Sequence, residues 1–215
     1  MIKIDANIIQ HLLKTLAARK RVFCSEMDFQ LQLGWLIKEN GYELSLEYDP
    51  GCFETNASLD IMIWKPEQVA IELKYKTAHF EMKLDGHSLR LKNHAAQDIG
   101  RYDFFRYVSR VEHIVANGKA SRGFAIFLTN DSGYWRSGRN GTVDEMFRMF
   151  DGRTIKSGQL RWGNRASSGT MRGREKSIEL TRDYIFSWKD YADHCTRNGV
   201  FRYLLVDVES VTAAF

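Results

Sequence analysis

Residues 58–76 read SLDIMIWKPEQVAIELKYK, and this stretch decides the fold. Its two halves, Ser58–Trp64 and Val69–Lys76, are rich in apolar and β-branched residues, which predicts two β-strands. A short turn through Lys65-Pro66-Glu67 joins them. The segment before them, Tyr42–Tyr48, alternates between polar and apolar residues and predicts a third strand. Because short turns place consecutive strands side by side in opposite directions, the three strands predict an antiparallel meander.

Helices are predicted on either side of this meander. Apolar residues recur at helical spacing over about residues 7–20 and again over 25–40, which predicts two helices before the strands. After the meander, a polar stretch over about 77–93 leads to a long helix over about 94–116. The apolar run Gly123–Thr129 then predicts a strand that is buried on both faces. A helical crossover precedes this strand, so we expect it to lie parallel to a neighbour in the same sheet.

The segment over about 131–175 has a different character. It contains eight of the 16 glycines and shows no apolar period, which predicts an elaborate, partly mobile insertion with a short helix over about 143–150. Beyond the insertion we expect a helix over Thr181–Cys195 and a final strand over Phe201–Val208. The whole chain, residues 1–215, is therefore predicted to form one α/β domain with a central mixed β-sheet flanked by helices.

The composition agrees with a folded globular protein, since 44% of residues are hydrophobic and 27% are charged. No window approaches the roughly 18 apolar residues of a membrane helix, so we expect no membrane association. The sequence has no GxxxxGK[ST] motif, which disfavours P-loop nucleotide hydrolysis. Three widely spaced cysteines and an N-terminus unlike a secretory signal favour reduced thiols and a cytoplasmic location.

Three polar residues in the strands carry the chemical signal. Glu72 and Lys74 are two apart on one strand, so their side chains leave the same face. If Ile61 pairs with Ile71, Asp60 lies opposite Glu72, a register that needs an odd number of loop residues. Facing carboxylates repel, whereas a hard cation such as Mg²⁺ would turn that repulsion into binding. With Lys74 to assist a water nucleophile, these residues predict metal-assisted phosphodiester hydrolysis.

The pattern resembles the PD-(D/E)XK nuclease superfamily. Asp60, eleven intervening residues and then Glu72-Leu73-Lys74 match its short motif. Glu26 matches the acid that family members carry near the start of the helix before the meander. Gln97 matches a glutamine often found in the helix after the ExK strand. The order of predicted elements over about residues 7–129 matches as well.

The resemblance implies a restriction-endonuclease-like fold and an Mg²⁺-dependent or Mn²⁺-dependent endonuclease that hydrolyses DNA. The implied site consists of Asp60, Glu72, the Leu73 backbone carbonyl and Glu26 as metal ligands, Lys74 as the residue that assists the nucleophile, and Gln97 as the residue that orients the site. A homodimer and a larger defence or repair complex are the assemblies that the resemblance leaves open.

A basic segment within and just after the insertion suggests a contact with nucleic acid. Seven basic residues and one acid lie between Arg153 and Lys176, interleaved with glycines and Trp162, which suits an arm that closes on a phosphate backbone. The candidate contacts are Arg161, Arg165, Arg172 and Arg174. The alternative function is a non-catalytic module that binds nucleic acid or protein on the same fold.

Overall fold

The computed structural model of the protein describes residues 3–19, 22–52, 57–84 and 86–210. In chain order the elements are α1 (Ala6–Arg19), α2 (Glu26–Glu39), β1 (Glu43–Tyr48), β2 (Leu59–Lys65), β3 (Val69–Lys76), β4 (Phe80–Leu84), β5 (His87–Leu91), α3 (Gln97–Ala116), β6 (Arg122–Thr129), the 3-10 helix η1 (Glu145–Phe147), β7 (Thr154–Ile155), β8 (Gly158–Leu160), α4 (Ser168–Met171), β9 (Ile178–Leu180), β10 (Tyr184–Ile185), β11 (Trp188–Asp193) and β12 (Val200–Glu209). Within these ranges, no helix has the length and apolar character needed to cross a membrane.

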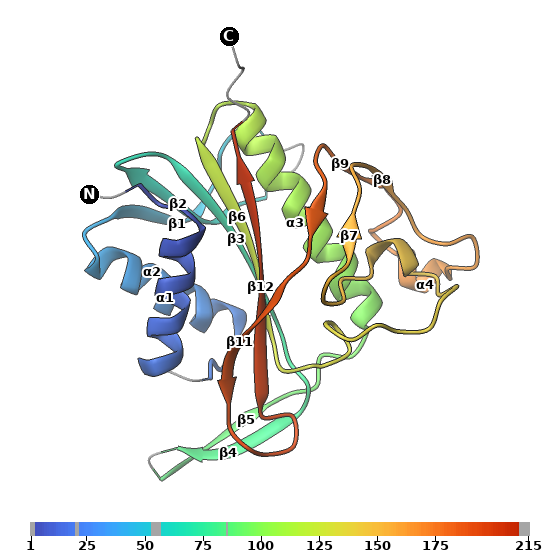
Figure 1. Ribbon diagram of the computed structural model, residues 1–215, viewed down its shortest axis with the longest axis horizontal. Coiled ribbons are helices and arrows are strands. Elements are labelled where there is room, and N and C mark those ends of the chain that lie inside the picture. The colour runs from blue at the N-terminus through green and yellow to red at the C-terminus, as the bar shows by residue number, and fades with distance from the viewer. Residues whose placement is uncertain (1–2, 20–21, 53–56, 85, 211–215) are drawn as a thin grey trace.

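A mixed six-stranded sheet, ordered β1-β2-β3-β6-β12-β11, forms the centre of the molecule (Figure 1). The predicted meander is confirmed, because β1, β2 and β3 pair antiparallel. The predicted register is confirmed as well: Ile61 pairs with Ile71, and the connection of residues 66–68 has an odd length. Strand β6 pairs parallel with β3, as the helical crossover between them predicts.

Helices cover both faces of the sheet: α1 and α2 lie on one side and α3 lies on the other (Figure 1). Each side has its own apolar core. Ile71, Leu73 and Tyr75 of β3 belong to the core under α1 and α2. Because side chains alternate along a strand, Glu72 and Lys74 leave β3 on the α3 side.

The start of α2 follows the prediction. The Ser25 hydroxyl accepts a hydrogen bond from the Asp28 backbone N–H at 3.1 Å and caps the helix. The Asp28 carboxylate in turn accepts from the Cys24 backbone N–H at 2.9 Å. These reciprocal bonds make Glu26 the first helical residue and direct the N-terminus of α2 toward β3, which Glu26 contacts.

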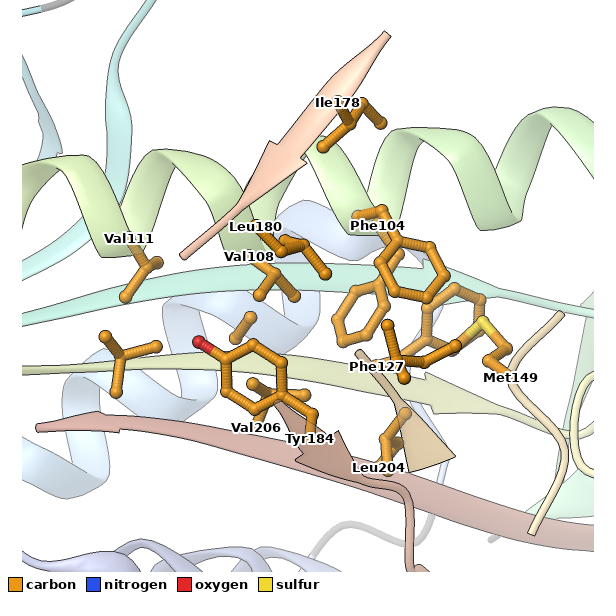
Figure 2. Packing of buried hydrophobic residues seen from close by; sticks show 14 of the residues in the cluster. Phe104, Val108, Val111, Phe127, Met149, Ile178, Leu180, Tyr184, Leu204 and Val206 are labelled. Atoms are coloured by element: carbon orange, nitrogen blue, oxygen red, sulfur yellow. The ribbon is translucent and has the colours of Figure 1, made fainter. Parts of the chain in front are cut away.

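The insertion is packed against α3 and contributes to the same apolar core as α3 and the sheet face under it. Figure 2 shows Met149 of the insertion, and Ile178 and Leu180 of β9 just after it, on the side of the sheet where Phe104 and Val108 of α3 lie. The predicted short helix over 143–150 is reduced to the single turn of η1. The lack of apolar period reflects irregular backbone, since the buried residues of this segment come from short strands and turns.

Two further sequence-based predictions need correction. The predicted helix over Thr181–Cys195 is wrong, since this segment forms β10 and β11. Its residues Tyr184, Phe186 and Trp188 are buried while their neighbours are exposed, a period of two that is typical of a strand. The polar stretch after β3 contains the hairpin of β4 and β5, and α3 begins at Gln97, three residues later than predicted.

Candidate active site

Strands β2 and β3 separate at the point where the predicted acidic residues lie. Their ladder covers Ile61–Ile63 and Val69–Ile71. Beyond it, the Leu73 backbone N–H donates to Asp60 Oδ2 at 2.5 Å, and the Tyr75 backbone N–H donates to a Glu26 oxygen at 2.7 Å. Carboxylates thus occupy the edge of β3 that faces β2. Because the N–H and C=O groups of one strand residue point to the same side, the Leu73 carbonyl faces this edge too.

Glu26 links this edge to the lysine. Its Oε1 accepts a hydrogen bond from Lys74 Nζ at 3.2 Å, while its Oε2 holds the Tyr75 N–H. Lys74 Nζ also donates to the Tyr107 hydroxyl at 3.4 Å and lies 5.0 Å from the centre of that ring. The Glu26 side chain is 37% exposed and the Lys74 side chain 11% exposed, so the site opens to solvent at Glu26.

Glu72 is the most deeply buried member of the site. Its side chain is 1% exposed, and Arg110 Nη2 lies 2.9 Å from Glu72 Oε1. The same nitrogen donates to the Ser58 carbonyl oxygen. Glu72 Oε1 is buried and accepts no hydrogen bond of good geometry from the described residues. The carboxylate is therefore close to a positive charge but has no directional donor on that oxygen.

Helix α3 supplies residues that the sequence analysis did not identify. Tyr107 and Arg110 are one turn apart on the face of α3 that meets β3. The signal that could have found them is the run of polar residues at helical spacing on a helix predicted to cover the sheet. Such a run suggests that polar groups of the helix and the strand satisfy each other.

A second unpredicted contribution comes from β1. Glu47 has a φ of 51°, in the left-handed region. Burial is the main cause that raises the pKa of Asp60, and the charges of Glu26 and then Glu47 add to it. Gln30 of α2 donates to the Glu47 carboxylate at 2.7 Å and to the Asp60 carbonyl oxygen at 2.8 Å. Gln30 is a buried polar residue on an otherwise apolar helix face, which is the pattern that could have indicated its role.

Burial and mutual repulsion change the acidity of these groups. Burial raises the pKa of Asp60 to about 6, although the Leu73 N–H opposes that change. Burial also raises the pKa of Glu72 well above its ordinary value, against the effect of the Arg110 charge. A hydrogen bond between these two carboxyl groups lowers the pKa of Asp60 and raises that of Glu72. The pair thus retains a proton more readily than isolated carboxyl groups do.

The environment of Lys74 favours the charged form of its side chain. Burial alone would lower the pKa of its ammonium group, but the Glu26 carboxylate and the Tyr107 hydroxyl outweigh burial and raise that pKa. The ammonium form is therefore the form of Lys74 that this environment favours at neutral pH. A positive charge at this position suits stabilisation of a developing negative charge better than it suits proton abstraction.

The other predicted site residues lie elsewhere. Gln97 Nε2 donates to Asp131 at 2.7 Å, and Gln97 accepts from Arg101 at 3.3 Å, so its described contacts tie α3 to the loop after β6. Arg174 forms a two-pronged pair with Asp103 of α3, at 2.8 and 3.0 Å. The remaining candidates, Arg161, Arg165 and Arg172, are exposed.

The donor set suits one hard divalent cation. Among the described residues, no three or more His, Cys, Asp or Glu side chains are placed to hold one metal ion. Mg²⁺, however, commonly takes only one or two protein carboxylates and completes its shell with water and substrate phosphate. Asp60 and Glu72, with the Leu73 carbonyl between their strands, meet that requirement, and Arg110 Nη2 is the cation that now lies beside Glu72 Oε1, at 2.9 Å.

Comparison of the chain with known proteins finds no matching family model, no matching curated protein and no matching solved structure.

Proposed function

We propose that the protein is a metal-dependent nuclease with a restriction-endonuclease-like fold. DNA is the substrate that the family resemblance implies. One observation carries the proposal: where β2 leaves β3, Asp60 and Glu26 bind the backbone N–H groups at the edge of β3 that faces β2, and Glu72 and Lys74 belong to the same stretch of β3. Acidic groups and a lysine gathered at one strand edge suit hydrolysis of a phosphodiester, whose transition state gathers negative charge.

Each residue has a defined task in this proposal. Asp60, Glu72 and the Leu73 carbonyl would hold Mg²⁺ or Mn²⁺, which supplies Lewis-acid polarisation of the phosphate and a more acidic water. Lys74, kept cationic by Glu26 and Tyr107, stabilises the charge that develops on the phosphate oxygens. Glu26 accepts the Lys74 hydrogen bond and its side chain is 37% exposed, so it can reach and orient an attacking water.

A second candidate function is a binding module that uses the same surface without hydrolysis. The near-complete burial of Glu72 and its contact with Arg110 favour this alternative, because an ion pair already neutralises the carboxylate. The two candidates differ in one respect that can be measured, which is whether phosphodiester bonds break when metal is present.

The test is an assay with supercoiled plasmid and single-stranded DNA in Mg²⁺, Mn²⁺ or EDTA. We expect the wild type to cleave only with metal, and Asp60→Asn and Glu72→Gln to lose that activity. Asp49→Asn is the matched control, because Asp49 is an exposed turn residue that accepts a hydrogen bond from the Gly51 N–H. Salt-sensitive DNA binding without cleavage by the wild type would favour the binding module and contradict the nuclease.

A further inference from the structure

Arg110 lies beside Glu72, the carboxylate that we propose as a metal ligand, where a metal ion would be expected instead of a basic side chain. Its guanidinium lies 2.9 Å from Glu72 Oε1 and is itself only 16% exposed. The guanidinium is held from two further directions. It donates to the Ser58 carbonyl oxygen, just before β2, and it lies 5.5 Å from the centre of the Tyr107 ring.

The Arg110–Glu72 contact is an ion pair without a well-aligned hydrogen bond to Glu72 Oε1. Glu72 Oε1 accepts no well-aligned hydrogen bond from the described residues, although Arg110 lies within ion-pair distance. Arg110 therefore offsets the cost of burying a charged carboxylate without saturating its lone pairs. A divalent cation on Glu72 would meet the guanidinium at a separation of a few ångströms, where like charges repel strongly in a site with little water.

We propose that Arg110 is the built-in counter-ion of Glu72 and competes with the divalent cation for that carboxylate. This inference rests on the proposed function, since it takes Glu72 as a metal ligand. In the metal-free protein Arg110 stabilises the buried charge. When metal enters, the Arg110–Glu72 contact must weaken, so Arg110 lowers the affinity of the site for metal.

The opposite role makes the opposite prediction. If Arg110 served to orient Glu72 toward the metal, its removal would weaken metal binding, as the loss of outer-sphere partners usually does. The sign of the change in affinity therefore separates a competitor from a positioning partner.

The experiment measures Mn²⁺ affinity by electron paramagnetic resonance of free Mn²⁺, without nucleic acid and in mildly alkaline buffer. The proteins are wild type, Arg110→Met, Arg110→Lys, Asp60→Asn and the control Arg106→Met, which removes an exposed charge one turn away on α3. We expect Arg110→Met to bind Mn²⁺ about tenfold more tightly than wild type, because a nearby positive charge is gone. Arg110→Lys, which keeps the charge, and Arg106→Met should bind like wild type.

The competition would be overturned if Arg110→Met bound Mn²⁺ no more tightly than wild type. It would also be overturned if Arg110→Lys bound Mn²⁺ as tightly as a tighter-binding Arg110→Met. If wild type binds Mn²⁺ and Asp60→Asn does not, the metal site stands, and these Arg110 results overturn only the proposed competition. If neither wild type nor Arg110→Met binds Mn²⁺, the proposed metal site fails with it.

A second readout uses the wild type and does not depend on the folding of a variant. The Arg110 Nε–Hε signal, assigned in nuclear magnetic resonance spectra with Arg110→Lys, should shift on addition of Mg²⁺ and exchange faster with water. An unchanged signal in the presence of bound Mg²⁺ would contradict the proposal.

Discussion

At the scale of single residues, the site places two acids where burial disfavours their ionised forms. Asp60 is half-buried near Glu26, Glu47 and Glu72. Burial and the charges of Glu26 and Glu47 raise its pKa to about 6. In the unfolded chain the same carboxyl group ionises near 3.8. The folded state therefore binds a proton that the unfolded state has lost between those two values. Carboxyl groups with a pKa changed by burial and neighbouring charges are common at functional sites.

This difference predicts how stability depends on pH. The contribution of Asp60 to the free energy of unfolding is fully present below about pH 3.8 and is lost as the pH rises to about 6. In EDTA at neutral pH, Asp60→Asn should therefore be more stable than wild type by about 1–3 kcal/mol, with the advantage shrinking toward pH 4. Urea unfolding across this range checks the prediction, with Asp49→Asn as the control. A gain that is independent of pH would contradict the assigned cause.

At the scale of elements, one helix end brings Glu26 to the strand edge. The Ser25 hydroxyl caps α2 at the position that makes Glu26 its first residue. The Glu26 carboxylate then reaches the Tyr75 N–H and Lys74 Nζ. A local rule for helix starts thus determines where an acid of the site lies.

The cap predicts a measurable loss of stability. Ser25→Ala should lower the free energy of unfolding by about 1 kcal/mol, because the Asp28 N–H loses its acceptor. Ser25→Asn, which retains an acceptor, should lower it by only a few tenths of that amount. Denaturant titration of both variants compares them directly. Equal stability of the two would show that the hydroxyl does not act as the cap.

The elements also show why sequence reasoning succeeded in one place and failed in another. The β2–β3 register was predictable because Ile61 and Ile71 belong to apolar faces that must align, and one-residue slippage would invert them. That register determines where Asp60, Glu72 and Lys74 lie relative to one another. The strand at Trp188–Asp193 was missed because a mix of aromatic and charged residues fits both periods until its pairing with β12 is known.

Other parts of the site depend on long-range packing. Arg110 reaches Glu72 only because α3 crosses over β3, and Glu47 is turned by a backbone angle that no local motif signals. Gln97 and Arg174 were selected for their residue type, yet their contacts are with Asp131 and Asp103. Residue type and spacing therefore placed Asp60, Glu72 and Lys74 relative to one another, whereas the contacts of Gln97 and Arg174 depend on packing between distant elements.

At the scale of the whole molecule, the insertion is anchored to α3 beside the site. The Arg174–Asp103 pair and a hydrogen bond from the Tyr102 hydroxyl to the Lys176 carbonyl oxygen join the two. Trp162 stacks on Tyr102 with ring centres 5.5 Å apart. Exposed Arg161, Arg165 and Arg172 extend from the same segment. Arg174 therefore anchors the segment to α3, whereas the exposed arginines are available to contact DNA.

This division predicts different consequences for two neighbouring arginines. Arg174→Ala should lower the free energy of unfolding by about 1–3 kcal/mol, because it removes a two-pronged charged hydrogen bond. Arg172→Ala should change stability by less than about 0.5 kcal/mol, as exposed substitutions usually do. It should instead weaken DNA binding and reduce its salt dependence by about one unit of slope. Denaturation and binding titrations at several salt concentrations check both; equal stabilities would contradict the division.

The most direct test of the account is the rate of metal-dependent DNA cleavage by Lys74→Ala, with Lys65→Ala as the matched control. Lys65 lies on the neighbouring strand in an exposed pair with Glu43. The account predicts that Lys74→Ala loses about 100-fold or more of the cleavage rate, because charge at the phosphate is no longer stabilised, while Lys65→Ala cleaves like wild type. Full metal-dependent cleavage by Lys74→Ala would contradict the assignment of the chemistry to the β3 edge.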